Sequence, residues 1–372
     1  MEEAAALKTD ATLEIAASAT DPQRRKLGRL ILWGGSLILV VVIAAQVLDS
    51  IGAIDFGFKT WRLVAYAYLL WSVALGASQV LRRGEPGLRA LFILPAALFT
   101  VAVVVFPTLF GLSIAFTNWN LQAAAGRQFN GVDNLVTMFH DSFFWNALLN
   151  MVYYMIAVVF EYAIAFGLAL LLNADIRGRR FFRVLFLLPF MLSPVAVSWM
   201  VGKSLMETRF GPIAALARDL GWSNPAFFTS PWIARISIEV MDAWIWIPFI
   251  LILLLAGLQA MPKEVTEAAQ VDGASSWQSF WKITFPLMMP VSVTAIILRI
   301  IFKLKLADLI INVTFGGPGG ATDTVSSYIY RVYRDRSNVG YGTMLAMVYL
   351  VIIIVFITML LNFVNKRMQK IT

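Results

Sequence analysis

Charged side chains inside long apolar stretches are the first residues of this chain that could do chemistry. Arg299 lies about 18 Å into the apolar run 287–311, at 1.5 Å per helical residue, which is near the middle of a bilayer. Glu161 lies at a similar depth in the run 150–173. An ionisable group there costs about 2.5–3.5 kcal/mol on insertion scales, so such groups usually face a partner or water. We predict that Arg299 and Glu161 pair if their helices touch.

Further charges follow on the same run. Lys303 lies one turn beyond Arg299 on the same stripe, whereas Lys305 and Asp308 lie on the other side of that helix. The three-residue spacing of Lys305 and Asp308 allows their charges to offset each other. Arg299 and Lys303 have no partner on their own helix, which indicates partners on other helices or a water-filled path.

A second charged stripe lies in the apolar run 232–260. Arg235 and Glu239 have the four-residue spacing of a helical ion pair. Asp242 and Trp246 continue this stripe deeper into the run. The Trp246 ring could stack on a sugar, although a tryptophan at a helix interface is the commoner arrangement.

Together these residues predict a polar, partly cationic lining that could solvate the hydroxyl groups, or an anionic group, of a solute. The candidate members of this substrate pathway are Glu161, Asp242, Trp246, Arg299, Lys303 and Asp308. The alternative interpretation is that the charges only fasten helices together or reach the outer interface on their flexible stems. The sequence leaves both interpretations open.

The composition excludes several other kinds of site. Cysteine is absent, which excludes disulfides and thiolate metal sites, and the single histidine, His140, leaves no histidine cluster for a metal or a catalytic dyad. We therefore predict neither a catalytic residue nor a metal site. The formal net charge of +8 could suggest nucleic acid, but the basic residues lie at the ends of apolar runs, which is the pattern of membrane orientation. We expect no nucleic-acid partner.

The apolar runs themselves predict an all-α integral membrane protein. Hydrophobic residues make up 59% of the chain and its mean hydropathy is +0.75. Because about 20 apolar residues cross the hydrocarbon core as a helix, we expect about eight transmembrane helices. These are 27–48, 61–81, 90–117, 150–173, 181–206, 232–260, 287–311 and 343–365. The first run is too long and too far into the chain for a cleaved signal peptide.

Basic residues flank these runs on alternate sides. The clusters precede the first run and follow the second, fourth and last: Arg24, Arg25, Lys26, Arg29, Arg82, Arg83, Arg89, Arg177, Arg179, Arg180, Arg183, Lys366, Arg367 and Lys370. Placing all of them in the cytoplasm satisfies the positive-inside rule with an even number of spans. Both termini are then cytoplasmic, and so is the segment between the sixth and seventh runs.

That segment, from Glu267 to Pro286, is polar and broken by Gly273, although two spans need only a short turn between them. Its small residues and flanking carboxylates could form a compact helical knob that docks into a cleft of another protein: Glu264, Glu267, Ala268, Ala269, Asp272, Gly273 and Ala274. Gly273 would permit a tight turn, and Pro286 suits the first turn of the next helix. The alternative is an ordinary solvated loop.

In its spacing the segment resembles the EAA loop of permease subunits in binding-protein-dependent ABC importers. The residues in register are Glu267, Ala268, Ala269, Gly273, Ile283 and Pro286, with Phe285 where the family usually has Leu. Three further stretches are similar to carbohydrate-type members of the family, such as maltose and glycerol-phosphate permeases: Phe129–Asn134, Arg179–Pro189 and Thr314–Pro318. The chain therefore looks like a permease of the sugar-handling subfamily.

The resemblance implies a domain organisation. A six-helix permease core would occupy 88–366 and carry the ATPase-coupling loop at 262–286. Two additional helices would occupy 27–87, and cytoplasmic tails would lie at 1–26 and 367–372.

The resemblance also implies a function. The chain would move a sugar or sugar derivative, which could be anionic, across the bacterial inner membrane by alternating access. Its partners would be a second related permease subunit, two cytoplasmic ATPase subunits, an external solute-binding protein and membrane lipid. ATP and Mg²⁺ would bind to the ATPase subunits, and this chain would bind no cofactor. The Gly-rich run at 316–320 lacks the Lys-Ser/Thr of a P-loop, so the chain itself is not expected to be an enzyme.

A secondary carrier driven by an ion gradient is the alternative function. It would explain Glu161 and Asp242 as proton or sodium sites inside the membrane. It leaves the polar segment 267–286 unexplained, and the sequence has no clear inverted repeat.

Overall fold

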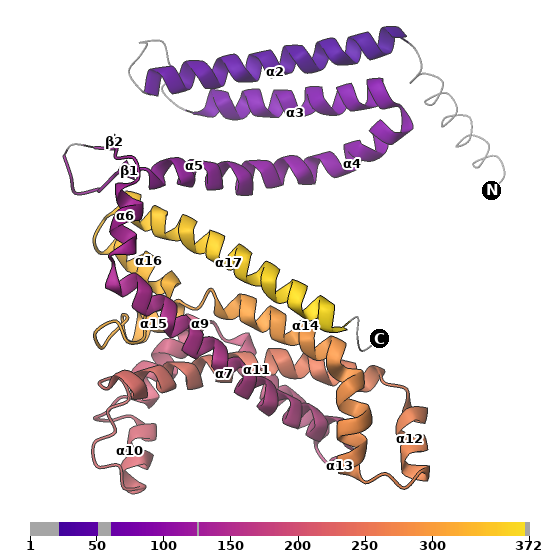
Figure 1. The fold of residues 1–372 in the computed structure, drawn as a ribbon, viewed down its shortest axis with the longest axis vertical. Helices are drawn as coiled ribbons and strands as arrows, with labels where there is room; N and C mark the ends of the chain where they lie inside the picture. Colours follow the sequence, from indigo (N-terminus) through magenta and orange to yellow (C-terminus); the bar gives the residue numbers. More distant parts are fainter. Residues whose placement is uncertain (1–21, 51–60, 125, 369–372) are drawn as a thin grey trace, which may run out of the picture. The chain divides into compact units, whose positions relative to one another are not determined.

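The computed structural model describes residues 22–50, 61–124 and 126–368 (Figure 1). Most of the predicted tail at 1–26, and the end of the predicted tail at 367–372, lie outside the described residues. The chain divides into two compact units, Met1–Phe110 and Gly111–Thr372. This division falls within the third predicted span, and the expected domain boundary after residue 87 stays a prediction.

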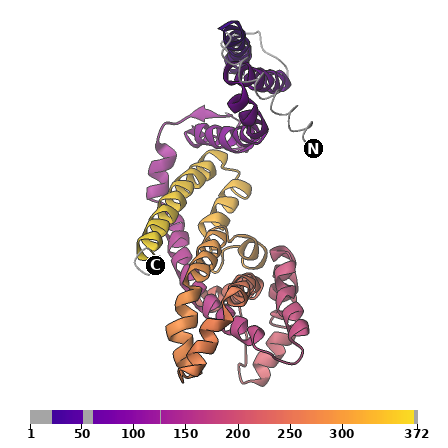
Figure 2. The same ribbon diagram turned by 90° about the vertical axis from the view of Figure 1, so that its right-hand side faces the viewer.

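In its described residues, 22–50 and 61–110, the first unit has three long helices. They are α2 (Pro22–Ser50), α3 (Arg62–Arg83) and α4 (Glu85–Thr100), and a π-helical turn η1 (Val101–Val105) joins α4 to α5 (Phe106–Ala115). Helices α2 and α3 pack side by side (Figures 1 and 2). The Trp71 indole donates a hydrogen bond to Ser36 Oγ at 3.1 Å across this pair, and the Tyr68 hydroxyl donates to the Leu98 carbonyl of α4 at 2.7 Å.

Apolar side chains cover the outside of this first unit. Trp33 and Phe92 expose 74% and 81% of their surfaces in the isolated chain. Such exposure in a soluble protein would be an aggregation hazard, but it suits a helix whose solvent is lipid. The outward faces of α2 to α4 are therefore those of membrane-spanning helices.

The second unit is a helical assembly with one short pair of strands. Strands β1 (Thr117–Asn118) and β2 (Gln128–Phe129) pair antiparallel. The helices are α6 (Asp133–Phe139), α7 (Ser142–Asn173), α8 (Arg179–Leu187), η2 (Leu188–Met191), α9 (Pro194–Val197), η3 (Ser198–Leu205), α10 (Pro212–Asp219), α11 (Pro231–Ala260), α12 (Lys263–Val271), α13 (Ser276–Ser279), η4 (Phe280–Thr284), α14 (Phe285–Lys303), α15 (Asp308–Val313), α16 (Val325–Arg334) and α17 (Val339–Met368).

Seven helical stretches in the described chain are long and apolar enough to cross a membrane, and a bent pair makes an eighth candidate. The all-α membrane fold with about eight spans is therefore confirmed. The bent pair corresponds to the predicted span 181–206, whose two halves meet at 94°. The bend lies at Leu192 and Ser193, which are extended because Pro194 disfavours a helical residue before it. The Ser193 hydroxyl then caps α9 by accepting a hydrogen bond from the Ala196 N–H at 3.1 Å.

The helix that contains the seventh predicted span begins earlier than residue 287. A capping box between Ser275 and Gln278 starts it, and the chain stays helical through α13, η4 and α14. Pro286 lies in the first turn of α14, as predicted, but Thr284 before it is already helical. The capping box at Ser275, rather than Pro286, therefore starts this helix.

Helices α7, α11 and α14 pack against one another in the middle of the second unit (Figures 1 and 2). Small side chains line the contact on two of them, where Ala165, Ala169 and Ala295 are fully buried. Leu254 of α11 fills the space between them and is also fully buried. Small residues allow helices to approach closely in membranes. Helices α7, α11 and α14, named here the frame, therefore hold the side chains that point inward between them.

Asp141 connects α7 to two further helices, α16 and α17. Its Oδ1 accepts the N–H groups of Phe143 and Phe144 at 3.0 and 3.4 Å and so caps α7. Its Oδ2 accepts the hydroxyls of Tyr328 and Tyr341, each at 2.5 Å, from α16 and α17. Burial and the Asp141 carboxylate raise the pKa of Tyr328, so its hydroxyl remains a donor at neutral pH.

Asp141→Ala is expected to lower the free energy of unfolding by roughly 2–4 kcal/mol, because the cap and the acceptor of two tyrosine hydroxyls are lost together. Asp141→Asn keeps a capping oxygen and should lose less. Thermal unfolding of the purified protein in detergent measures both variants. A wild-type midpoint for Asp141→Ala would show that this carboxylate does not hold the helices.

Candidate functional site

Five charged side chains from three helices form a buried network, named here the charge network. Glu161 comes from α7, Glu239 and Asp242 from α11, and Arg299 and Lys303 from α14. Arg299 and Lys303 have no exposed surface, and Glu161 and Asp242 expose 2% each. Helix periodicity accounts for this arrangement, because residues three and four apart on α11 and α14 face the same neighbour.

Arg299 bridges α14 to both other helices. Its Nε and Nη2 donate to the two carboxylate oxygens of Glu161 at 2.5 and 2.9 Å, and Nη2 also donates to Asp242 Oδ2. A bidentate guanidinium–carboxylate pair is among the strongest charge-assisted arrangements. The predicted pairing of Arg299 with Glu161 is therefore present.

Lys303 lies at the centre of the three carboxylates. Its Nζ donates to Glu161 Oε1 at 3.0 Å, to Asp242 Oδ2 at 2.5 Å and to both oxygens of Glu239 at 2.7 Å. The carboxylates offer oxygens within 4.8 Å of one another, a spacing that could hold a metal ion. Because the Lys303 ammonium bonds all three, the positive charge at this point comes from the protein itself.

The predicted ion pair between Arg235 and Glu239 is wrong. Arg235 Nε donates instead to the Ala321 carbonyl at 2.8 Å and to Asn150 Oδ1 at 3.2 Å. Glu239 thereby becomes a member of the charge network that the sequence analysis did not include. Its three-residue spacing from Asp242, on the same face of α11, is the signal that could have found it.

The other predicted pathway residues lie outside the charge network. Trp246 packs beside it, with its ring 4.6 Å from that of Phe302 and 5.2 Å from the guanidinium carbon of Arg299. Asp308 is exposed at the start of α15, and no ion pair in the described chain joins it to Lys305. The structure therefore brings together four of the six predicted residues, places Trp246 against them, and leaves Asp308 apart.

This geometry matches the interpretation that the charges fasten helices. Each cation reaches carboxylates on α7 and α11, so the network connects all three helices of the frame. It holds three carboxylates against two cations, which gives it no surplus positive charge when all are ionised. Removing one partner of such a buried set typically destabilises a protein by about 3–5 kcal/mol.

The predicted knob is the short helix α12 together with the turn that ends it. Gly273 follows α12 in the left-handed region at φ +76°, and its N–H donates to the Gln270 carbonyl at 3.1 Å. The Ala274 N–H donates to the Ala269 carbonyl at 3.0 Å, which completes a Schellman turn. No described atom lies within 4 Å of a Cβ built at Gly273, so only the backbone conformation requires glycine there.

Most of the knob faces outward. Glu264, Glu267, Ala268 and Asp272 are exposed, whereas Ala269 exposes 5% and anchors the helix. The predicted coupling residues thus lie together on α12 and its turn, with Pro286 apart from them on α14.

A groove of about 710 Å³ separates the knob from α7. Gln270 and Ala274 line one side and Phe166 lines the other. Trp277 and Trp281 of the following helical turns also line it and expose 71% and 47% of their surfaces. Exposed aromatic side chains around a groove are typical of a protein-docking surface.

Comparison with known protein families matches residues 142–371 to one family, the binding-protein-dependent transport system inner membrane component. The chain belongs to this family. Both the charge network and the knob lie within the matched residues of the permease. The predicted family is therefore confirmed, as is a multi-pass membrane protein.

Curated relatives carry permease names. The permease is 32% identical over 289 residues to a probable ABC transporter permease protein of Sinorhizobium fredii, which covers 76% of this chain and 92% of that protein. It is 32% identical over 266 residues to the sulfoquinovosyl glycerol transport system permease protein of Agrobacterium fabrum, covering 71% and 86%. It is 30% identical over 277 residues to the trehalose/maltose transport system permease protein of Thermococcus litoralis, covering 74% and 93%.

Two solved structures share the fold. One is a bacterial ABC transporter involved in the import of the acidic polysaccharide alginate, with a TM-score of 0.66, 23% identity, and coverage of 75% of this chain and 95% of that one. The other is a bacterial alginate ABC transporter in complex with its alginate-pentasaccharide-bound periplasmic protein, with a TM-score of 0.64, 22% identity, and coverage of 84% and 99%. At these identities the likeness concerns the fold alone.

Proposed function

We propose that this permease is the transmembrane subunit of an ATP-driven importer that moves a sugar or sugar derivative into the cytoplasm by alternating access. The names of two relatives support the solute class, since one transports sulfoquinovosyl glycerol and the other trehalose and maltose. A second related permease subunit would complete the pathway, and an external binding protein would deliver the solute. The complex of a neighbour in fold with a periplasmic protein supports this last partner.

The knob is the observation that supports ATP-driven transport. A nine-residue helix, capped by a Schellman turn and exposed at Glu264, Glu267 and Ala268, lies between two candidate spans. Two cytoplasmic ATPase subunits would bind such knobs and move the attached helices as rigid bodies when they close. ATP and Mg²⁺ would be bound by those subunits, and this chain would bind neither.

We further propose that the permease lies in the bacterial inner membrane with both termini in the cytoplasm. The basic residues at the ends of the spans support this orientation. A core at 88–366 would carry the pathway, and the helices at 27–87 would be an addition to it.

The charge network bears on whether an acidic solute could bind to Arg299 or Lys303. An acidic group would reach Arg299 or Lys303 only if their carboxylate partners gave way, because the network holds more carboxylates than cations. We therefore propose that the network acts first on the packing of α7, α11 and α14. The hydroxyls or the acid of the solute would be recognised along other parts of the pathway.

Copurification tests the function against the secondary-carrier alternative. We expect a tagged, full-length permease, expressed with its chromosomal neighbours, to retain an ATPase subunit through gel filtration. Vesicles with the retained complex should take up solute only with ATP and the binding protein. Uptake driven by a proton or sodium gradient without ATP would contradict the proposal.

A further inference from the structure

Two cavities meet at the arginines that begin α8. One, of about 520 Å³, is lined by Arg179, Arg180 and Arg183 together with Asp175. The other, of about 220 Å³, lies between α7, α8 and α11 and also has Arg183 in its wall. A polar cavity and an apolar cavity therefore share one guanidinium.

Within the described ranges of the chain, the arginines of the polar cavity have no anionic partner. After a flip of the Gln259 side-chain amide of α11, which exchanges its oxygen and nitrogen, the oxygen can accept hydrogen bonds from Arg179 Nη2 and Arg183 Nη2, each at 3.0 Å. Arg183 Nε is buried and has no hydrogen-bond partner in the part of the chain that the structure describes. Among the described residues, no ion pair involves Arg179, Arg180 or Arg183, although Asp175 lines the same cavity.

The position of these arginines on α8 adds to the unbalanced charge. A helix N-terminus carries partial positive charge and favours acidic side chains, but the first turn of α8 has two arginines and no acidic residue. The positive-inside rule explains why basic residues lie on this side of the membrane. It does not explain why they converge on one cavity around one glutamine.

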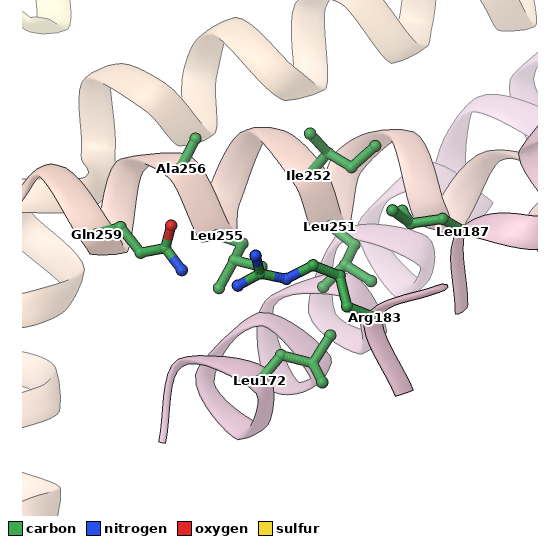
Figure 3. Close-up of a pocket in the computed structure, with 8 residues that line it drawn as sticks. All are labelled: Leu172, Arg183, Leu187, Leu251, Ile252, Leu255, Ala256 and Gln259. Atoms are coloured by element: carbon green, nitrogen blue, oxygen red, sulfur yellow. The ribbon is translucent and has the colours of Figure 1, made fainter. Parts of the chain in front are cut away.

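The adjoining cavity is apolar. Leu172, Leu251, Leu255 and Ala256 line it, and Figure 3 shows the Arg183 guanidinium beside Leu255, directed toward Gln259. A soluble anion such as phosphate would use the arginines and leave this apolar cavity unfilled. A phospholipid has both parts, because its phosphate is joined to acyl chains.

We propose that the headgroup phosphate of an anionic phospholipid binds to Arg179, Arg180 and Arg183, with the start of an acyl chain in the apolar cavity. Basic pockets between membrane helices are suited to anionic headgroups, and each arginine near the surface strengthens such binding. A bound lipid would fasten the bent α8 segment to α7 and α11. With the proposed topology, the lipid belongs to the cytoplasmic leaflet.

Lipid binding can be measured on the full-length permease with its copurified subunits, without ATP or solute, so the outcome does not depend on the proposed transport. The protein is placed in phosphatidylethanolamine nanodiscs with increasing fractions of phosphatidylglycerol, and retained phosphatidylglycerol is counted by native mass spectrometry. We expect Arg179→Gln to weaken binding about fivefold, and Arg179→Gln with Arg183→Gln about thirtyfold. Gel filtration verifies that each variant is folded.

Two further variants identify the ligand. Arg177→Gln removes an exposed arginine that lines neither cavity and should leave binding unchanged. Ala256→Phe fills the apolar cavity and should weaken phosphatidylglycerol binding while leaving any binding of inorganic phosphate as it was.

Three outcomes would overturn the proposal. An equal loss in Arg177→Gln would mean attraction by general charge. Competition by inorganic phosphate, with no effect of Ala256→Phe, would mean a soluble anion. Loss of a copurified subunit from the arginine variants would mean that the pocket belongs to a subunit contact.

Discussion

Lys303→Met is expected to lower strongly the amount of folded permease in the membrane. The methionine keeps much of the lysine's volume but leaves three carboxylates within 4.8 Å of one another, with Arg299 as the one remaining cation of the network. An uncompensated buried charge of this kind costs about 3–5 kcal/mol, against a total stability of about 5–15 kcal/mol. Fluorescence-detected gel filtration of solubilised membranes measures the loss. Lys305→Met, two residues away and exposed, is the matched control and should be near wild type.

A second substitution should restore the fold. Adding Glu239→Gln to Lys303→Met returns the network to its original net charge, so the double variant should recover much of the folded protein. Glu161→Gln alone should be milder than Lys303→Met, because it leaves two carboxylates facing two cations. Full loss in the double variant would contradict this electrostatic account.

The same double variant separates a structural role from contact with the solute. Lys303 is still absent from it, so recovery of uptake for both a neutral and an acidic sugar would mean that the ammonium holds helices together. Recovered folding with uptake lost only for the acidic sugar would instead support the predicted cationic lining.

Gly273→Asp is expected to leave the permease folded but to separate ATP hydrolysis from uptake. The substituted residue must adopt φ +76°, which costs roughly 1–2 kcal/mol for an L-residue and less for aspartate, and its side chain points into open space. The added carboxylate would lie beside Asp272, at the apex that the proposed ATPase subunit contacts. A misplaced charge at a protein interface costs about 2–5 kcal/mol, which is a loss of uptake of about thirtyfold or more. Solute uptake and ATPase activity are measured on the same vesicles.

Gly221 provides a matched control for this experiment. It ends α10 with φ +96° and open space around its Cβ, and the same two Schellman hydrogen bonds close its turn, at 2.9 Å each. It lies between the fifth and sixth predicted spans, which the proposed topology places outside the cell, on the opposite side of the membrane from the ATPase subunits. Gly221→Asp should therefore carry the same backbone strain and still transport, whereas normal uptake by Gly273→Asp would count against the coupling role.

Some parts of the charge network could be predicted and others could not. Depth along a helix follows from residue count, so the pairing of Glu161 with Arg299 could be predicted at 1.5 Å per residue. The four-residue spacing of Arg235 and Glu239 predicted the wrong partner for Glu239, because it takes no account of residues on other helices. Lys303 of α14 donates a hydrogen bond to Glu239 at 2.7 Å. Arg235 instead donates to the carbonyl of Ala321, which is 86 residues away in sequence.

The same contrast holds for the bend in a helix and for the polar cavity lined by Arg179, Arg180 and Arg183. The apolar run 181–206 was found from its composition, and Pro194 accounts locally for the break, but the 94° angle between the two halves depends on how they pack. The basic residues after the fourth span were assigned to membrane orientation. That two of them share Gln259 follows from the contact of α8 with α11.

Run lengths, flanking charges and the spacing of the EAA segment are local properties of the chain, and they were sufficient to predict a multi-span membrane permease of this family. Which carboxylate meets which cation, how sharply a helix bends, and which arginines share a cavity depend on helix faces that meet only after packing. Residues far apart in sequence set those contacts, so the tertiary structure alone decided them.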